Sequence, residues 1–303
     1  MTGRVALAST AVHADVDEDL PSIVAALRAR DVDAVVADWH DEGFDWAGVD
    51  LAVIRSTWDY TRHLDDFLAW VDRVAAVTRL VNPAPVVRWN ADKRYLLDLA
   101  AAGVPTVPTR ILGPGDGASS ADAVRDVAAG GPVVVKPAVS AGAVDTDRYG
   151  PDEVAEAGAH AGRLLAQGRS VLVQPYVTGI DDQGETGLVY LGDAFSHAFV
   201  KGPILRSGVR SEAREYDEDI AARVASPPER AVAEAALDAV ATAVPGLSRG
   251  DLLYARVDMA PHQAGPLLLE LELVEPSLFC SAGAGAIGRV ADAVLAAVRS
   301  PNG

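Results

Sequence analysis

Cysteine is almost absent from this sequence. Cys280 is the only cysteine among 303 residues, so no intramolecular disulfide can form, which agrees with a reducing cytoplasm. No apolar run approaches the roughly 18 to 20 residues that span a bilayer. Residues 1–10 are predicted to form a first strand and not a signal peptide. We therefore expect a cytoplasmic protein without a membrane partner.

Positive charge is also scarce. The chain carries 26 Lys and Arg residues against 43 Asp and Glu residues, a formal net charge of −17. Most of such a surface would repel the phosphates of a nucleic acid, so we expect no nucleic-acid partner. A locally basic cleft can still bind a nucleotide, so the overall charge does not exclude ATP.

Several familiar catalytic motifs are missing. There is no G-x-x-x-x-G-K-[ST] phosphate loop, no H-E-x-x-H zinc motif and no G-x-S-x-G nucleophile turn. Residues 283–288 fit G-x-G-x-x-G, but a dinucleotide site needs a whole βαβ unit and an acidic residue about 20 positions later. Neither follows, so we interpret this segment as a turn into a last helix.

Two acidic stretches near the C-terminus are the most informative feature that is present. Residues 253–258 read LYARVD and residues 267–276 read LLLELELVEP, so both are acidic segments in apolar surroundings. Unpaired carboxylates are too costly to bury, so such a cluster needs a cation. Oxygen ligands without His or Cys favour Mg²⁺ or Mn²⁺.

Strand alternation predicts which of these side chains meet. Glu270 and Glu272 share one face of their strand, roughly 6.5 to 7 Å apart, and Arg256 and Asp258 share a face of the other. Pairing the two strands would gather three carboxylates and one guanidinium, so we predict a metal site at Asp258, Glu270 and Glu272. Alternation places Glu275 on the face opposite Glu272, unless Pro276 interrupts the strand.

Hydrophobic periodicity predicts an α/β (α+β) chain. Strands alternate with helices over the first 80 residues, as in a parallel sheet with crossovers. A small α+β unit follows, and antiparallel strands dominate from about residue 186. The expected strands are 5–9, 34–38, 51–54, 133–136, 171–174, 188–191, 195–201, 252–258 and 267–275. The expected helices are 20–30, 67–77, 92–102, 229–244 and 287–298, with a further helical stretch between 136 and 171 and a loop at 113–120.

Three lysines are candidate phosphate ligands. Lys136 ends an apolar strand and is followed by small residues, including Ser140 and Gly142, whose backbone N–H groups can approach an anion closely. Lys93 begins a helix, where a cation opposes the helix dipole unless an anion binds. Lys201 ends another strand. For Lys136 we favour phosphate binding over a side chain that simply reaches solvent, and the same two alternatives stay open for Lys93 and Lys201.

Five segments in the same order and spacing resemble the ATP-grasp superfamily, in its glutathione-synthetase-like branch. The resemblance covers about residues 80 to 280. It implies an ATP-grasp fold with a Rossmann-like substrate domain (1–84), a small lid domain (85–177) and an antiparallel-sheet catalytic domain (178–303). The matching segments are NADK at 90–93 with GVPTVP at 103–108, VKP at 135–137, QPYV at 174–177, RVD at 256–258 and ELE at 270–272.

The resemblance also implies roles for individual residues. It predicts ATP and two Mg²⁺ ions as cofactors, with Mn²⁺ as a substitute, and phosphorylation of a carboxylate to an acyl phosphate that a nitrogen then attacks. Arg256 would stabilise the oxyanion and Lys201 would assist catalysis. The implied nucleotide ligands are Lys93, Lys136, Ser140, Gly142, Gln174, Tyr176, Val177, Asp181 and Lys201. Glu272 departs from the family's Asn, so whether it binds one ion or both stays open.

A narrower resemblance concerns the substrate. Residues 55–60, 184–190, 195–198 and 275–279 are similar to the O-ureidoserine cyclo-ligases of cycloserine biosynthesis. This implies an amino-acid-like substrate whose own nitrogen closes a five-membered ring. The implied substrate contacts are Arg55 for an anionic group, Asp59 for an ammonium, Tyr60 and Arg256.

Two alternatives remain open at this point. The same ATP and metal residues would serve a ligase that joins two substrates, a carboxylic acid and an amine. A nucleotide-binding protein without catalysis is a third hypothesis, which the combination of Arg256, Asp258 and Glu270 disfavours. The branch also includes homo-oligomers, but no segment identifies an interface or a role for Glu185 or His197.

Overall fold

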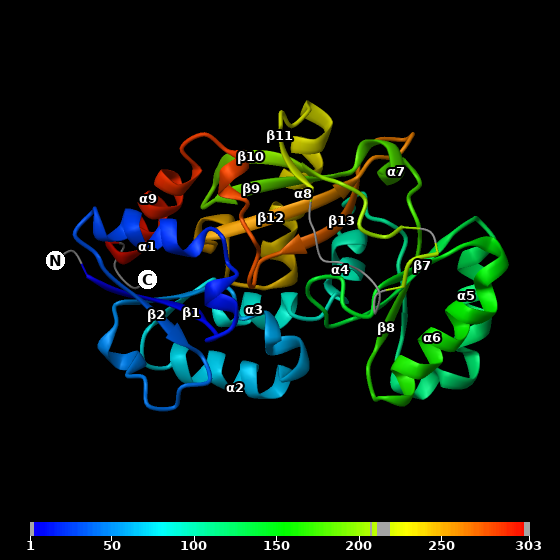
Figure 1. The fold of residues 1–303 in the computed structure, drawn as a ribbon, viewed down its shortest axis with the longest axis horizontal. Helices are drawn as coiled ribbons and strands as arrows, with labels where there is room; N and C mark the ends of the chain where they lie inside the picture. The colour runs from blue at the N-terminus through cyan, green and yellow to red at the C-terminus, as the bar shows by residue number, and fades with distance from the viewer. Residues whose placement is uncertain (1–2, 207, 211–218, 300–303) are drawn as a thin grey trace.

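The computed structural model describes residues 3–206, 208–210 and 219–299, and its strands form three sheets (Figure 1). The first is parallel, in the order β2-β1-β3-β4, and the other two are antiparallel, in the orders β5-β8-β6-β7 and β11-β10-β9-β12-β13. The strands are β1 Arg4–Ser9, β2 Asp33–Asp38, β3 Leu51–Ile54, β4 Arg79–Val81, β5 Arg110–Leu112, β6 Val133–Pro137, β7 Asp147–Tyr149, β8 Val171–Pro175, β9 Glu185–Leu191, β10 Ala194–Lys201, β11 Ile220–Arg223, β12 Tyr254–Ala260 and β13 Leu267–Glu272.

Helices cover faces of all three sheets. The α-helices are α1 Leu20–Arg28, α2 Leu64–Ala75, α3 Ala84–Asn90, α4 Tyr95–Ala101, α5 Ser120–Ala128, α6 Val154–Ala166, α7 Gly179–Gln183, α8 Pro227–Ala243 and α9 Ala286–Arg299. Short 3-10 helices are η1 His13–Asp15, η2 Trp46–Gly48, η3 Trp58–Arg62, η4 Pro114–Ser119, η5 Pro151–Glu153, η7 Arg249–Asp251 and η8 Cys280–Ala282. None of the described helices is long and apolar enough to cross a membrane.

The first sheet is buried on both faces, which explains its continuous apolar strands. Along β3, Leu51 and Val53 join the core under α1 and α9, whereas Ala52 and Ile54 join the core against α2. The chain passes from β1 to β2 on one side and then to β3 on the other. Ligands of such sheets bind beyond the strand ends at this switch point, so the segments after β1 and β3 are placed to form a site.

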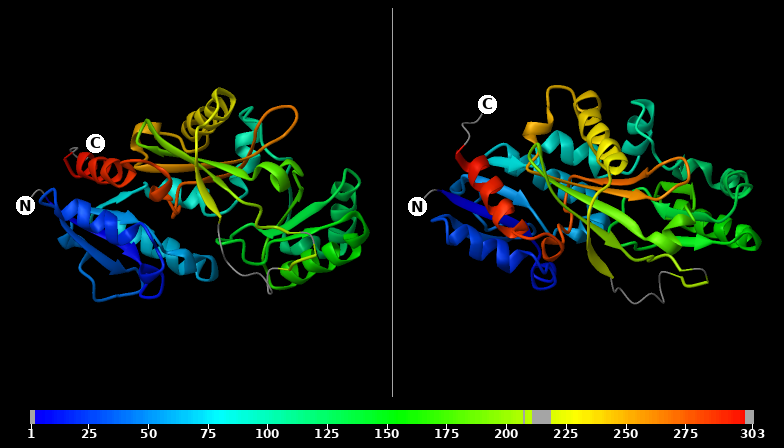
Figure 2. Two further views of the ribbon diagram at one scale, coloured as in Figure 1. Left: turned by 45° about the horizontal axis from the view of Figure 1, so that its top comes forward. Right: turned by 90° about the horizontal axis from the view of Figure 1, so that it is seen from above.

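The third sheet has one apolar face and one polar face. Ala255, Val257 and Met259 of β12 pack under α8 and α4, as does Leu271 of β13. Helix α8 (yellow) lies along this face in Figure 2, and α9 (red) lies beside α1 (blue). The alternate residues of β12 and β13 therefore point away from α8, toward the second sheet.

The second sheet likewise has one face packed against helices and one face turned toward the third sheet. Val133 and Val135 of β6 are buried against α5 and α6. Val134 and Lys136 alternate with them and face the third sheet's polar side, where they line a shared cavity. Each of the three expected segments thus contains one complete sheet, while the exact domain boundaries stay a prediction.

The structure contains the expected strands and long helices with ends shifted by a few residues, but three expectations are wrong. The first α4 residue is Tyr95 and not residue 92, and the segment expected as a loop at 113–120 contains η4 and the start of α5. Strand β13 ends at Glu272, because Leu273 bonds to asparagine side chains and no longer to β12. Short elements such as β4, β7 and α3 were not anticipated, since a segment this short carries too little periodicity.

Candidate active site

A cavity of about 1330 Å³ lies where the three sheets converge. The first sheet contributes the segments that follow β1 and β3, the second contributes β6 and the loop after it, and the third contributes its polar face. Most small-molecule sites measure roughly 300 to 1,000 Å³. This cavity is therefore large enough for a nucleotide together with a second small molecule.

The floor of the cavity is the pair of acidic strands. Arg256 lies opposite Glu272, and Asp258 lies opposite Glu270, across the antiparallel ladder of β12 and β13. The Arg256 guanidinium donates to Asp258 at 3.0 Å (Nε to Oδ1) and 2.8 Å (Nη2 to Oδ2), and it also donates to Glu272. Two of the three expected carboxylates, Asp258 and Glu272, thus lie around the guanidinium, whereas Glu270 pairs with lysines.

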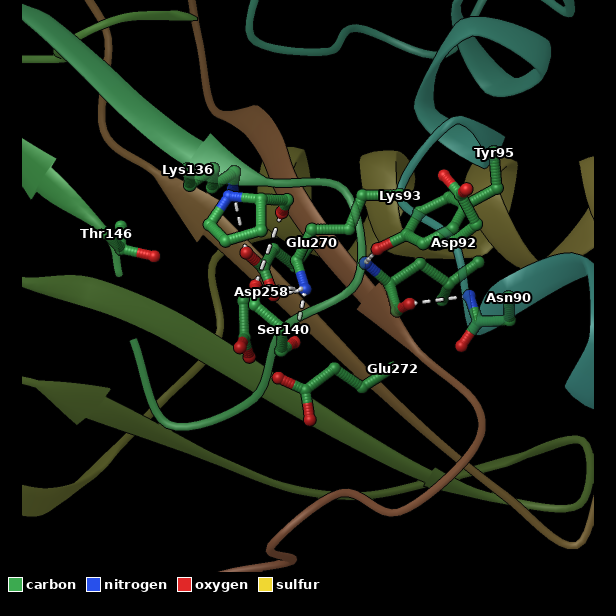
Figure 3. Close-up of polar contacts among 12 residues, drawn as sticks. Asn90, Asp92, Lys93, Tyr95, Lys136, Ser140, Thr146, Asp258, Glu270 and Glu272 are labelled. Atoms are coloured by element: carbon green, nitrogen blue, oxygen red, sulfur yellow. Dashed lines mark hydrogen bonds and ion pairs between the residues drawn. The ribbon is translucent and has the colours of Figure 1, made fainter. Parts of the chain in front are cut away.

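One end of this floor is rich in lysine (Figure 3). Lys136 Nζ donates to Glu270 Oε1 at 2.7 Å, and Lys93 Nζ lies 3.8 Å from Glu270 Oε2. Lys201 lies close by and pairs with Glu185 at 3.2 Å. Burial alone would raise the pKa of Glu270, but Lys136 and Lys93 outweigh burial and hold that pKa well below its ordinary value. Glu270 is therefore ionised at neutral pH.

The other end of the floor has an excess of carboxylates. Burial raises the pKa of Glu272, and Asp258 and Glu270 add to this increase, while Arg256 opposes it. Glu275 also lines the cavity, so the expectation that it lies on the opposite face is wrong. The strand ends at Glu272, and strand alternation no longer applies beyond that residue.

Side chains from the first half of the chain complete the free edge of β13. Asn90 donates to Leu271 O at 2.8 Å and accepts from Leu273 N at 2.8 Å, so its carboxamide brackets Glu272. The Tyr95 hydroxyl accepts from Leu271 N at 3.0 Å, and Asn82 donates to Leu273 O at 2.7 Å. The sequence analysis did not anticipate that Asn82, Asn90 and Tyr95 bond to the backbone at the end of β13. The available signal was an Asn within an apolar segment, because a buried Asn side chain needs hydrogen-bond partners.

The loop after β6 covers the lysine-rich end. Lys93 Nζ donates to the Ser140 carbonyl at 2.7 Å and to Ser140 Oγ at 3.2 Å, which ties the loop to the floor. Gly142 has φ +60°, and Ala143 and Asp145 also have positive φ. Ser140 and Gly142 both line the cavity, as predicted for residues that approach a phosphate.

The segment expected to contact adenine lies at the C-terminal end of β8. Gln174, Tyr176 and Val177 line the cavity, and the Gln174 amide donates to Thr109 at 2.8 Å. Asp181 is not among the lining residues. It forms an ion pair with Arg148 at 2.7 Å and accepts from the Tyr176 hydroxyl at 2.7 Å, so the expected contact with a ribose has no support from this geometry.

The substrate residues expected after β3 separate into two groups. Asp59 and Tyr60 line the cavity, whereas Arg55 does not. Arg55 is only 2% exposed and donates to Asp17 at 3.3 Å and to Pro276 O at 3.2 Å, while its Nε has no hydrogen-bond partner among the described residues. Because Arg55 is buried and does not line the cavity, it secures the wall and does not present a donor to the cavity. A long cation beside a buried carboxylate pairs with it, and the sequence did not show that Asp17 would be this close.

Asp59 occupies a different environment. Its carboxylate accepts from Trp39 Nε1 at 3.0 Å and lies 2.6 Å from His40 Nε2. His13, which the sequence led us to expect as a solvated surface residue, and Arg62, which it did not single out, also line this end. Both follow strand ends at the switch point, which is the signal that could have identified them.

The predicted metal ligands have suitable chemistry but are occupied by cations. Asp258, Glu270 and Glu272 are hard oxygen donors that face one cavity, which fits Mg²⁺. In the described part of the chain, however, no three His, Cys, Asp or Glu side chains lie close enough to form a ready ion site. Arg256 and Lys136 neutralise these carboxylates instead, and metal binding has to displace or share those contacts.

The N-terminal part of the chain and its full length were each matched by known proteins. Residues 5–82 match the family model described as D-cycloserine synthetase DcsG, N-terminal domain. The chain is 41% identical over 289 residues to the cycloserine biosynthesis protein DcsG of Streptomyces lavendulae, which covers 91% of this chain and 92% of that protein.

Two solved structures superpose on this chain over nearly its whole length. The crystal structure of D-cycloserine synthetase DcsG superposes with a TM-score of 0.89 at 37% identity, covering 98% of this chain and all of that one. The D-alanine–D-alanine ligase of Bacillus anthracis, solved with ATP, superposes with a TM-score of 0.67 at 14% identity, over 98% of this chain and 97% of that one. The second likeness concerns the fold alone.

Proposed function

This chain belongs to the DcsG family of ATP-grasp ligases, and on that premise we propose that it cyclises O-ureidoserine to cycloserine. The enzyme would phosphorylate the substrate's carboxylate with ATP and release ADP. The ureido nitrogen bound to oxygen would then attack the acyl phosphate, closing an isoxazolidinone ring and releasing phosphate. Reaction with water would remove the carbamoyl group left on the ring nitrogen as CO₂ and ammonia.

The lysine-rich end of the floor suits the first step. Lys136 and Lys93 can exchange Glu270 for the phosphates of ATP, and Lys201 adds a third positive charge nearby. Asp258, Glu270 and Glu272 would hold Mg²⁺, with two ions proposed. When bound, Mg²⁺ neutralises phosphate charge as the phosphoryl group moves.

The opposite end suits the second step. Arg256 lies between the lysine-rich end and the substrate wall, where its guanidinium can stabilise the oxyanion that forms at the acyl carbon. Asp59 offers a carboxylate for the substrate's ammonium, and Tyr60 lines the wall beside it. The loop that includes Ser140 would exclude water, which would otherwise hydrolyse the acyl phosphate.

The observation that carries this proposal is the pairing of β12 with β13 beneath Lys93 and Lys136. The pairing puts the carboxylates proposed to bind metal on one face of the third sheet, and the lysines proposed to bind phosphate reach that face from β6 and from the segment before α4. The single Cys280 is buried, and burial raises the pKa of its thiol to about 12, so it is unreactive. This agrees with a reducing cytoplasm as the site of the reaction.

The experiment supplies O-ureidoserine alone with ATP and Mg²⁺ and measures ADP, phosphate and cycloserine. We expect stoichiometric formation of all three. ADP release without cycloserine, or no ADP above background across a panel of amino acids, would contradict the proposal.

A two-substrate ligase is the second candidate, because a cavity of about 1330 Å³ leaves room for a separate amine beside the nucleotide and the acid. Turnover of O-ureidoserine only after an amine is added, with formation of an open-chain amide, would favour this candidate. Since the chain is a ligase, a purely nucleotide-binding role is set aside.

A further inference from the structure

Glu275 differs from the other carboxylates of the cavity in its partners. Tyr60 donates its hydroxyl to the Glu275 carboxylate, and Trp58 Nε1 donates to the Glu275 carbonyl at 3.0 Å, which fixes the backbone there. Within the described residues, no lysine or arginine forms an ion pair with Glu275, whereas Glu270 pairs with Lys136 and Glu272 with Arg256. Glu275 is thus a cavity carboxylate that no bound cation neutralises.

Charged groups face Glu275 from several elements. Burial raises the pKa of Glu275, and the carboxylate of Glu272 on β13 raises it further. Lys93, the Tyr60 hydroxyl of η3 and Arg256 of β12 lower it, and the balance leaves a pKa of about 8. Glu275 therefore exchanges its proton near neutral pH.

Ring closure requires a group with this property. When the nitrogen attacks the acyl carbon it must lose a proton, and the leaving phosphate is already bound among lysines. Glu270 is held in its ionised form by Lys136, and both carboxylate oxygens of Asp258 accept hydrogen bonds from Arg256. Asp59 is held by Trp39 and His40. Glu272 also has a raised pKa, of about 7, but Arg256 pairs with it, and it is a proposed Mg²⁺ ligand. Glu275 has neither restraint, since it forms no ion pair with a described lysine or arginine and lies beyond the predicted metal ligands.

We propose that Glu275 is the general base for C–N bond formation, positioned by Tyr60. This inference depends on the proposed ligase chemistry and adds a residue to it. The nitrogen lone pair forms the bond to the acyl carbon while the bond from that carbon to the phosphate oxygen breaks. The phosphate leaves with the electron pair, the proton of the attacking N–H passes to the Glu275 carboxylate, and Glu275 then returns it to solvent.

The first experiment separates the two half-reactions in Glu275→Gln. ATP labelled with ¹⁸O in the β,γ-bridge reports acyl phosphate formation, because reversal scrambles the label, and cycloserine reports ring closure. We expect scrambling within a few-fold of the unmodified enzyme, and ring closure reduced by about 100-fold or more. Unchanged ring closure would overturn the inference, as would equal loss of both signals in a variant that still melts above the assay temperature.

The second experiment uses Tyr60→Phe and does not depend on Glu275→Gln folding. The Tyr60 hydroxyl lowers the pKa of Glu275, so its removal must move the rise of ring-closure rate to higher pH. We expect the ring-closure rate of the unmodified enzyme to rise with pH with an apparent pKa near 8. In Tyr60→Phe the same rise should occur at higher pH. An identical pH profile would contradict the assignment of Glu275.

The unmodified enzyme is the reference for both measurements. Absence of scrambling and of product with O-ureidoserine would refute the proposed function, and the role of Glu275 would fall with it. Scrambling with product formation, but no dependence on Glu275 or Tyr60, would leave the proposed function standing and refute the base alone. Glu42→Gln, an exposed glutamate away from the cavity, serves as the matched control and should behave as the unmodified enzyme.

Discussion

The two ends of the cavity floor carry the same residue type in opposite electrostatic states. Glu270 lies between Lys136 and Lys93, which keep its pKa low. Glu275, a few residues later in the chain, has a pKa of about 8, because burial and Glu272 outweigh the cations around it. Two glutamates of one cavity are thus a permanent anion and a proton acceptor.

The difference shows how one cavity can support two chemical steps. Phosphoryl transfer needs fixed charges that do not titrate, and the lysine-rich end supplies them. Amide formation needs a group that gains and loses a proton, and the carboxylate-rich end supplies one. Both environments lie along β13 and the residues just after it, so under the proposed mechanism the acyl phosphate would form close to its base.

The largest expected effect comes from Glu270→Gln. Removing this anion takes the ion-pair partner from Lys136 and the nearby negative charge from Lys93, and it removes a proposed Mg²⁺ ligand. Turnover should fall by about 100- to 1000-fold or more, the loss typical of removing one electrostatic group from an active site. Isotope scrambling should disappear together with cycloserine formation, unlike in Glu275→Gln. Near-normal turnover would remove Glu270 from the site.

Two substitutions test whether the ends of the cavity are separable. Lys136→Met should raise the KM for ATP by roughly 30-fold, which corresponds to ~2 kcal/mol for truncating one member of a buried charge pair. Asp59→Asn should instead raise the KM for the amino acid and leave that for ATP within two-fold. Steady-state kinetics with each substrate varied in turn gives both values. A rise in both constants for both variants would show that the ends are not independent.

The stability of the ligand-free protein should fall as the pH rises from about 5 to about 9. Glu275 binds its proton with a pKa of about 8 in the folded protein against an ordinary value of 4.5, so raising the pH through this window removes stability. The pKa of Glu270 is instead lowered in the folded protein, so its contribution to the free energy of unfolding is lost only when the pH falls below the ordinary pKa of a glutamate. In Glu275→Gln, the pH dependence of the free energy of unfolding should be shallower by up to ~5 kcal/mol, because each unit of the rise in pKa from 4.5 to about 8 corresponds to ~1.4 kcal/mol. Thermal melts across this pH range measure the difference. Parallel curves would exclude the raised pKa.

A smaller effect is expected from Asn90→Ala, which removes two bonds to the backbone on either side of Glu272. The free energy of unfolding should drop by about 1 to 3 kcal/mol, because Leu271 O and Leu273 N lose buried partners. The kcat should fall while the KM for ATP changes little, since Lys93 and Lys136 are untouched. Asn90→Asp keeps the acceptor and should recover part of the loss. A KM effect equal to the kcat effect would contradict a positioning role.

Much of the floor followed from sequence alone. Strand alternation is local, and it correctly put Glu270 with Glu272 and Arg256 with Asp258. Long apolar elements such as α8 and β9 were also evident, because their periodicity extends over several turns or pleats. Short elements such as β7 were not predicted, because β7 is held in place by its pairing with β6 and not by a pattern in its own residues.

Two predicted ligand contacts receive no support from the geometry, for the same reason in both cases. Arg55 was expected to contact a substrate, but Asp17 lies beside it and takes its guanidinium. Asp181 was expected at the ribose, but Arg148 pairs with it. In both cases, a residue more than 30 positions away decided what the charge does. Sequence patterns do not contain such pairings.

The sequence by itself determined which residues share a face of a strand and which families they resemble, because both depend on order along the chain. It identified the carboxylates, the lysines and the class of chemistry. Only the tertiary structure decided which carboxylate is an anion and which can take a proton. The pKa of a buried group depends on charges close in space, and the lysines that set Glu270 apart from Glu275 lie more than 130 residues away in sequence.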